Sequence, residues 1–230
     1  MIYTHRQLDY KKYRKLRGTL YAFEGSVGTG KSTLGWSLEK KLQDSGLKAK
    51  YYPEYRNDLL LDQYLKNMKR YAYTFQMFML MKRLEIYRDA YKFSLKGGIA
   101  IIDRSLLGDR TFARMLHRMK YITDEDWEIY NNVLMSEAYP EPDCILYLDC
   151  KPEKSYSRMI SRGIESETTS YTLDYFQSLN EAYMESIEET SHPVHIIDWN
   201  DDQELLVENG KKYLTNEIIC RVLDQIASLI

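Results

Sequence analysis

The residues from Gly25 to Ser32 constrain this chain more than any other segment. They read Gly-Ser-Val-Gly-Thr-Gly-Lys-Ser and match the pattern G-x-x-x-x-G-K-[ST] in full. In this pattern the glycines let backbone N–H groups turn toward phosphate oxygens, the lysine supplies positive charge, and the serine hydroxyl can ligate Mg²⁺. We therefore expect the phosphates of ATP to bind at Gly25, Ser26, Val27, Gly28, Thr29, Gly30, Lys31, Ser32 and Thr33.

Short apolar runs alternate with longer amphipathic stretches along the chain. The runs cover residues 19–23, 48–52, 99–102, 144–148 and 194–197. Helical periodicity predicts helices at 32–45, 73–95, 124–137, 173–189 and 216–229. Strands that are apolar on both faces and separated by helices are typical of a covered parallel sheet. We predict an α/β P-loop NTPase fold with a five-stranded parallel sheet flanked by helices.

The domain organisation is predicted to be simple. No repeat or Pro/Gly/Ser-rich linker divides the chain, so residues 18–230 are expected to form a single domain. Residues 1–17 are polar and basic and are expected to be a solvated extension, although targeting to an organelle stays open.

Composition excludes several classes of partner. The chain carries 32 Lys and Arg against 34 Asp and Glu, so its balance of charge does not suggest a nucleic-acid or membrane partner. No apolar run approaches the roughly 20 residues that span a bilayer. The three cysteines lack the close spacing of a zinc site. We expect a cytoplasmic protein with reduced thiols.

Polar residues follow two of the predicted strands. Glu54 comes after the second run, and Asp103 and Arg104 come after the third. Ligands of open α/β sheets bind at the carboxyl ends of the strands, where these residues meet the phosphate-binding loop. Phosphoryl transfer needs a positioned acceptor hydroxyl, a held metal ion and neutralised charge. We predict Glu54 as the general base, Arg104 as its catalytic partner, and Asp103 as the Mg²⁺ ligand beside Ser32; solvated surface residues are the alternative.

Arg158 and Arg162 stand four residues apart and so lie on one face of a helix. A cationic helix that closes over the transferred phosphate is a common lid arrangement, and we place such a lid at about 158–170. The alternative is a solvated basic helix face.

Taken together, these residues resemble the deoxynucleoside kinase family over about residues 20–197. The resemblance rests on an ordered series: the phosphate-binding loop, Glu54, Phe75-Gln76, Asp103-Arg104-Ser105, and the Arg158/Arg162 segment ending in Glu167. It implies ATP- and Mg²⁺-dependent phosphorylation of the 5′-hydroxyl of a deoxynucleoside, that is, nucleotide salvage by a kinase whose partners are small molecules. It also implies a homodimer.

The resemblance assigns further residues to substrate binding. Gln76 looks like the amide that contacts the nucleobase, because it offers a donor and an acceptor side by side. Tyr64 and Glu167 look like the pair that binds the 3′-hydroxyl. Phe112 looks like the phenylalanine that stacks on the base, although a small deletion is needed to align it. Tyr64 stands one residue farther from Gln76 than is usual in the family.

Arg83 and Asp109 bear on the choice of base. Family members that prefer deoxycytidine or purine deoxynucleosides carry an Arg and an Asp at these positions, and thymidine-accepting members carry neither. An Asp accepts from an exocyclic amino group but would face a carbonyl in thymine. We predict a preference for deoxyadenosine, deoxycytidine or deoxyguanosine over thymidine. The alternative is an ordinary surface ion pair.

One departure from the family and two rival functions stay open. Ile164 stands where the lid of the family usually has another arginine, so lid charge is either reduced or supplied elsewhere, for instance by Arg110. A nucleoside monophosphate kinase of the thymidylate kinase type shares the loop and the lid, but Glu167 would repel its phosphate-bearing acceptor. A kinase-like binding subunit without catalysis is the second rival.

Overall fold

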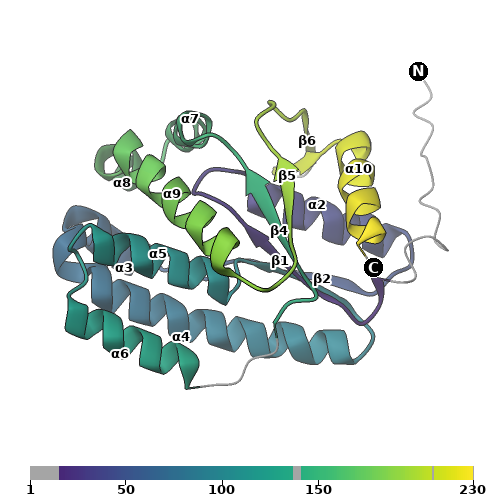
Figure 1. Cartoon of the computed structure of the whole chain (residues 1–230). Helices are drawn as coiled ribbons and strands as arrows, with labels where there is room; N and C mark the ends of the chain where they lie inside the picture. The colour runs from purple at the N-terminus through teal and green to yellow at the C-terminus, as the bar shows by residue number, and fades with distance from the viewer. Residues whose placement is uncertain (1–15, 137–140, 209, 230) are drawn as a thin grey trace.

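The computed structural model describes residues 16–136, 141–208 and 210–229. A five-stranded parallel sheet forms its centre, with strand order β2-β3-β1-β4-β5 (Figure 1). The strands are β1 (Leu20–Glu24), β2 (Ala49–Tyr52), β3 (Ile99–Asp103), β4 (Cys144–Asp149) and β5 (Val194–Asp198). The predicted fold class and all five predicted strands are confirmed.

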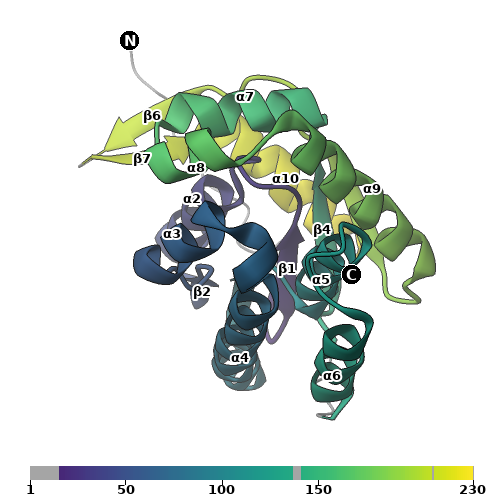
Figure 2. The same cartoon turned by 90° about the vertical axis from the view of Figure 1, so that its left-hand side faces the viewer.

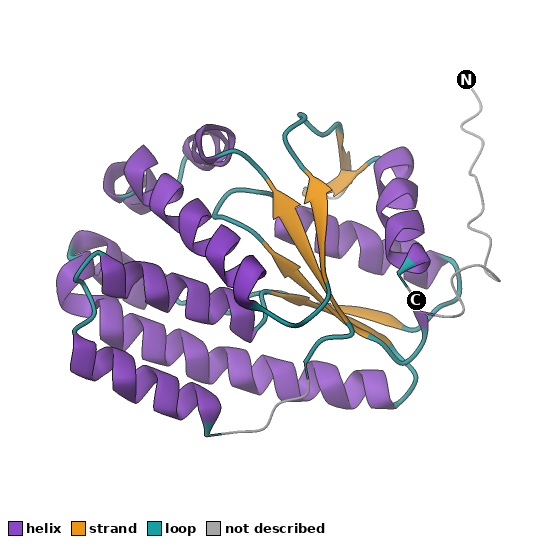
Figure 3. Ribbon diagram, viewed as in Figure 1, coloured by secondary structure: helices purple, strands orange, loops and turns teal. Residues whose placement is uncertain are grey.

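Helices cover both faces of this sheet. They are α2 (Lys31–Asp44), α3 (Asp58–Lys66), α4 (Met68–Leu95), α5 (Leu106–Arg118), α6 (Asp124–Met135), α7 (Pro152–Arg162), α8 (Glu165–Ser170), α9 (Leu173–Glu189) and α10 (Asn216–Ser228). In Figure 3, α2 and α10 lie on one side of the strands, and the helices from α3 to α6 with α9 lie on the other.

Alternation along β1 explains why the strands are apolar throughout. Tyr21 and Phe23 pack in the core cluster that includes α2 and α10, whereas Leu20 and Ala22 pack with residues of α4. Successive side chains of a strand point to opposite faces, so a strand covered on both sides needs apolar residues at every position.

Several helices were missed or begin earlier than predicted. No helix was predicted at α3 or α5, and α4 begins at Met68 instead of residue 73. Each of these three helices begins after a polar residue whose side-chain oxygen accepts a backbone N–H of the first turn: Asn57, Asn67 and Ser105. The end predicted for α6, residue 137, lies outside the described residues.

A short antiparallel hairpin was also missed. It comprises β6 (Leu205–Glu208) and β7 (Lys211–Leu214) and contacts α2, where the Leu214 N–H donates to the Ser37 hydroxyl at 2.9 Å. Gly210, with a φ of 74°, allows the tight turn between its strands. The hairpin lies outside the central sheet and β6 is exposed at every position, so its strands lack the burial on both faces on which the prediction relied.

The predicted extension is described only at its end. Residues 1–15 lie outside the described part of the chain, but Leu16 is buried in the core cluster with α2 and α10. Residue 16 therefore belongs to the packed structure and not to a solvated tail.

The carboxyl ends of the strands meet at one edge of the sheet. The phosphate-binding loop follows β1, Glu54 lies two residues beyond β2, and Asp103 ends β3. Figure 2 shows α7 and α8 running across the top of the molecule, over this edge. The fold thus gathers the predicted site residues beneath the predicted lid.

Candidate functional site

A cavity of about 990 Å³ opens between the phosphate-binding loop and α7. Its lining includes most of the predicted site residues: Val27, Gly28, Thr29, Gly30, Lys31, Ser32, Thr33, Glu54, Gln76, Arg83, Asp103, Arg104, Asp109, Phe112, Arg158, Arg162 and Glu167. This volume lies at the upper end of the range that ligand pockets occupy. One continuous space therefore joins the nucleotide end to the acceptor end.

The phosphate-binding loop is shaped for close approach of a ligand. Lys31 is buried, and its ammonium donates to the carbonyls of Gly25 and Ser26 at 3.0 and 2.7 Å. Burial lowers the pKa of Lys31 to about 8, and the charge of Arg104 adds to that effect. A Cβ at Gly28 would lie 2.6 Å from the Ser155 carbonyl oxygen of α7, so a glycine is required there.

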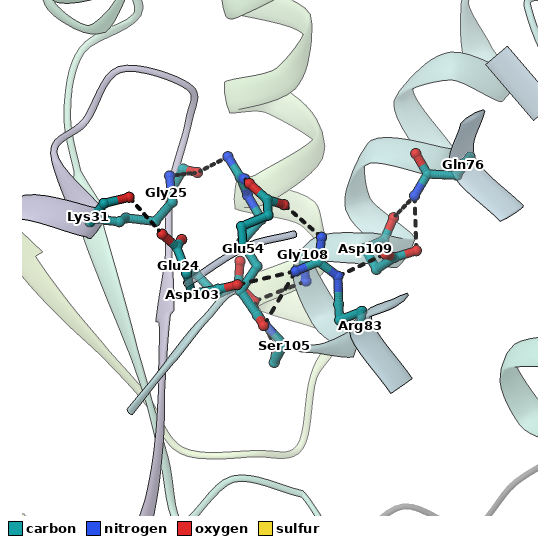
Figure 4. A network of polar contacts seen from close by, with 12 residues as sticks. Glu24, Gly25, Lys31, Glu54, Gln76, Arg83, Asp103, Ser105, Gly108 and Asp109 are labelled. Carbon is teal, nitrogen blue, oxygen red and sulfur yellow. Dashed lines mark hydrogen bonds and ion pairs between the residues drawn. The ribbon is translucent and has the colours of Figure 1, made fainter. Parts of the chain in front are cut away.

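Glu54 lines the cavity and is held between two arginines, of which Figure 4 labels Arg83. Its Oε1 accepts from Arg83 Nη2 at 2.7 Å, and its Oε2 is bonded to Arg104 Nη1. Burial raises the pKa of Glu54, but the guanidinium charges of Arg104 and Arg83 outweigh it and lower the pKa to about 2. The carboxylate is therefore ionised at neutral pH, and 28% of the side chain stays exposed toward the cavity.

Ser32 and Asp103 come together as predicted for a metal site. The Ser32 hydroxyl donates to Asp103 Oδ2 at 3.0 Å, and the Tyr51 hydroxyl donates to the same oxygen at 2.5 Å. Asp103 Oδ1 is buried without a hydrogen-bond partner among the described residues. Mg²⁺ prefers one or two protein oxygens completed by phosphates and waters. This donor set fits that pattern, and Tyr51 is a contact that the sequence reasoning missed.

Gln76, Arg83 and Asp109 form a buried network at the acceptor end. Asp109 Oδ2 accepts from Arg83 Nε at 2.7 Å, and Asp109 Oδ1 accepts from Gln76 Nε2 at 2.8 Å and from the Tyr130 hydroxyl at 2.6 Å. The Asp109 side chain is 0% exposed. The alternative of a surface ion pair is therefore wrong, and Tyr130 on α6 is a further partner that the sequence did not reveal.

The two residues assigned to the 3′-hydroxyl lie in different surroundings. Glu167 on α8 lines the cavity, is bonded to Arg162, and lies 3.9 Å from Arg56. Tyr64 is not among the described residues that line the cavity. Its ring stacks on Phe75 with centroids 4.6 Å apart, and its hydroxyl lies 3.3 Å from that of Tyr175. Tyr171, unlike Tyr64, lines the cavity together with Glu167.

Arg158 is anchored to the segment after β5. Its guanidinium donates to the carbonyls of Trp199 at 3.1 Å and Asp201 at 2.6 Å. Arg162 is bonded to Glu167, but its side chain is 41% exposed, so the alternative of a solvated basic face stays open for Arg162.

Further cations line the cavity besides Arg158 and Arg162. Arg110 is exposed and is not among the described residues that line the cavity, whereas Arg56 and Lys154 are. The Arg104 guanidinium lies over the Phe112 ring, 4.8 Å from its centroid, which places Phe112 next to Arg104 in the cavity wall.

Comparison with known proteins places the chain among kinases. A family model described as deoxynucleoside kinase matches residues 21–223. A deoxyadenosine kinase of Dictyostelium discoideum is 31% identical over 192 residues, which are 82% of this chain and 75% of that protein. A probable deoxycytidine kinase of fowlpox virus is 31% identical over 217 residues, covering 90% and 88%. A solved deoxyadenosine kinase from M. mycoides with bound dCTP shares the fold, with a TM-score of 0.71 and 24% identity over 91% of this chain and 99% of that one.

Proposed function

Because the chain belongs to the deoxynucleoside kinase family, we propose that it transfers the γ-phosphate of ATP to the 5′-hydroxyl of a deoxynucleoside with an amino-bearing base. The observation that carries the proposal is Glu54. Its ionised carboxylate lies on the same cavity as the phosphate-binding loop and is held by Arg83 and Arg104.

Glu54 acts on the acceptor hydroxyl. Bound in the cavity, the 5′-hydroxyl donates to this carboxylate, which orients the oxygen for attack and takes its proton as the phosphoryl group leaves ATP. A pKa near 2 makes Glu54 a weak base, so its role is first to position the hydroxyl. Arg104 lies beside it and neutralises charge on the transferring group.

The nucleotide end is built to hold triphosphate. Lys31 exchanges its bonds with the loop carbonyls for bonds to phosphate oxygens, and Arg158 and Arg162 approach from α7. Ser32 and Asp103 would hold Mg²⁺, which when bound neutralises phosphate charge and orients the γ-phosphate.

The base end favours an exocyclic amino group. An ionised carboxylate has about four lone-pair sites. Three of those on Asp109 are occupied by Gln76, Tyr130 and Arg83. The remaining site, on Oδ2, is covered in this structure, because the Asp109 side chain is 0% exposed. Once a bound base uncovers it, this site suits an amino hydrogen of adenine, cytosine or guanine, whereas the O4 carbonyl of thymine would face it with a second acceptor.

Gln76 supplies a second contact to the base. Since Asp109 can only accept, the amide must turn Nε2 toward it, which leaves the Gln76 carbonyl oxygen available to a donor on the base. All four bases provide such a donor, thymine through its N3–H, so this contact binds the base and leaves the choice between bases to Asp109. We assign the binding of the 3′-hydroxyl to Glu167. A contact from Tyr64 to the same hydroxyl stays a prediction, and it requires the Tyr64 ring to move into the cavity.

The experiment that tests the proposal measures kcat/KM for the four natural deoxynucleosides with ATP and Mg²⁺, alongside their monophosphates. Higher values for deoxynucleosides with amino bases support it. Preference for monophosphates identifies a thymidylate kinase type of activity, and ATP turnover that no acceptor stimulates identifies a binding subunit.

We also propose a homodimer. Several large apolar side chains on α4 and α6 are exposed, namely Met81, Ile129 and Met135, and a helical interface would bury them. Light scattering coupled to size exclusion tests it, and a monomeric mass at micromolar concentration would contradict it.

No helix of the described residues is long and apolar enough to cross a membrane.

A further inference from the structure

Glu24 is a fully buried carboxylate that the proposed reaction does not use directly. It ends β1, immediately before Gly25 of the phosphate-binding loop, and is 0% exposed. Its Oε1 accepts from the Ser105 N–H and hydroxyl, both at 2.7 Å, and from the Gly108 N–H at 3.1 Å (Figure 4). Its Oε2 accepts from the Tyr183 hydroxyl at 3.0 Å. One side chain thus joins β1 to α5 and α9.

The first turn of α5 is shaped around this carboxylate. A Cβ built at Gly108 would lie 2.1 Å from Glu24 Oε2 and 2.8 Å from its Cδ, so no larger residue fits there without displacing the carboxylate. The N–H groups at the start of a helix lack partners within the helix, and the helix dipole favours a negative charge there. Glu24 therefore caps the N-terminus of α5, although it belongs to strand β1.

Arg104 precedes this turn in a left-handed backbone conformation, with a φ of 67°. That conformation costs a residue with a side chain roughly 1–2 kcal/mol. The Arg104 N–H donates to the Phe23 carbonyl at 2.8 Å, and the next N–H, that of Ser105, donates to Glu24. The last two residues of β1 hold the backbone of Arg104 from both sides.

We propose that Glu24 is a positioning residue for catalysis: its carboxylate keeps residue 104 in this conformation, and thereby keeps the Arg104 guanidinium on Glu54 and on the Gly25 carbonyl, 3.3 Å away. The inference rests on the proposed function. Without the carboxylate, residue 104 relaxes toward negative φ and the guanidinium moves away from Glu54. A displacement of about 1 Å in a catalytic group can cost on the order of 100-fold in rate.

Three variants separate positioning from a general contribution to folding. Glu24→Ala removes every bond of the carboxylate. Glu24→Gln keeps one oxygen for Ser105 and Gly108 and can donate its amide hydrogen to the Tyr183 oxygen. Thr111→Val is the matched control, because it removes a buried hydrogen bond of α5, the 2.9 Å bond to the Ser186 hydroxyl, without touching Arg104.

The readouts are kcat, KM for ATP and the pH profile of kcat/KM for the deoxynucleoside. We expect Glu24→Ala to lower kcat about 100-fold with little change in KM for ATP, and Glu24→Gln and Thr111→Val to stay within several-fold of the wild type. Glu54 is faced by Arg104, by Arg83 of α4 and by Lys31 of α2. Moving Arg104 away raises the pKa of Glu54, so only Glu24→Ala should shift the acid limb to higher pH.

A folded Glu24→Ala protein with wild-type kcat and pH profile would overturn the inference, as would a Glu24→Gln protein impaired as strongly as Glu24→Ala. If Glu24→Ala does not fold, Ser105→Ala removes one of the bonds to Oε1, together with the cap that the same hydroxyl provides for the Leu107 N–H. For Ser105→Ala we expect a smaller loss of kcat than for Glu24→Ala, with the acid limb again shifted to higher pH. Unchanged kinetics in Ser105→Ala would overturn the inference about Glu24. A wild-type protein that phosphorylates no deoxynucleoside refutes the proposed function instead.

Discussion

Replacing Asp109 by Asn should remove most of the preference against thymidine. In the wild type the O4 carbonyl of thymine faces the Asp109 carboxylate, and a buried acceptor left against an acceptor costs about 1–3 kcal/mol. That penalty equals roughly 5- to 150-fold in kcat/KM. An Asn can turn its Nδ2 toward O4 and donate to it, but it then gives up the bond from Arg83 Nε, and Arg83 keeps only its ion pair with Glu54. The ratio of kcat/KM between deoxycytidine or deoxyadenosine and thymidine should therefore fall by up to this factor.

The same substitution should cost stability, and the structure bounds the cost. Removing one partner of a buried ion pair costs about 3–5 kcal/mol when the other charge is left alone. Arg83 is not left alone, because Glu54 still accepts from it at 2.7 Å. We therefore expect a loss in the free energy of unfolding below about 3 kcal/mol, measured by urea denaturation.

The assay is a competition in which all four deoxynucleosides share one reaction and the monophosphate products are separated and quantified. Asp44→Asn is the control, because Asp44 is exposed at the end of α2 and lies outside the cavity lining. A ratio that stays the same in Asp109→Asn would refute the reasoning. So would a wild-type enzyme for which thymidine has the highest kcat/KM.

Two further changes test the catalytic centre. Glu54→Gln should lower kcat by roughly 100- to 10,000-fold while the Kd for ATP is unchanged, and a kcat close to the wild-type value would contradict the role of Glu54. Lys31, with a pKa of about 8 in the free protein, should take up a proton when ATP binds near pH 8, because the phosphates raise its pKa. Calorimetry in two buffers of different ionisation enthalpy measures this uptake; equal enthalpies for the wild type would contradict it, and Lys31→Met should abolish it.

The sequence was sufficient where local pattern and general topology act together. The run ending at Phe23 and the loop up to Ser32 predict a strand, a turn and a helix start, and all three are present. Because parallel strands share one carboxyl edge, Glu54 and Asp103 could be assigned to the same site without knowledge of side-chain packing.

The sequence was insufficient where a contact depends on how two helices pack. Tyr130 of α6 reaches Asp109 of α5 where these two helices pack, and no spacing in the chain indicates that approach. The assignment of Tyr64 relied on its distance from Gln76 along the chain, but α3 and α4 are separate helices. Their packing turns Tyr64 toward Tyr175. Glu24 was missed because a carboxylate at the end of a strand looks the same whether it is solvated or caps another helix.

Arg83 connects base recognition to catalysis, because its guanidinium is bonded to both Asp109 and Glu54. Each single substitution, Asp109→Asn or Glu54→Gln, leaves Arg83 with one carboxylate partner. The double variant leaves the buried Arg83 guanidinium with neither. Leaving a buried charge unpaired costs about 3–5 kcal/mol. The double variant should therefore lose more free energy of unfolding than the two single variants together. The excess should be larger than the roughly 0.5 kcal/mol within which the effects of independent sites add. Urea unfolding of the four proteins measures the difference, and Asp44→Asn combined with Glu54→Gln should be additive. Additivity in the Asp109–Glu54 pair would show that Arg83 does not link the two ends of the cavity.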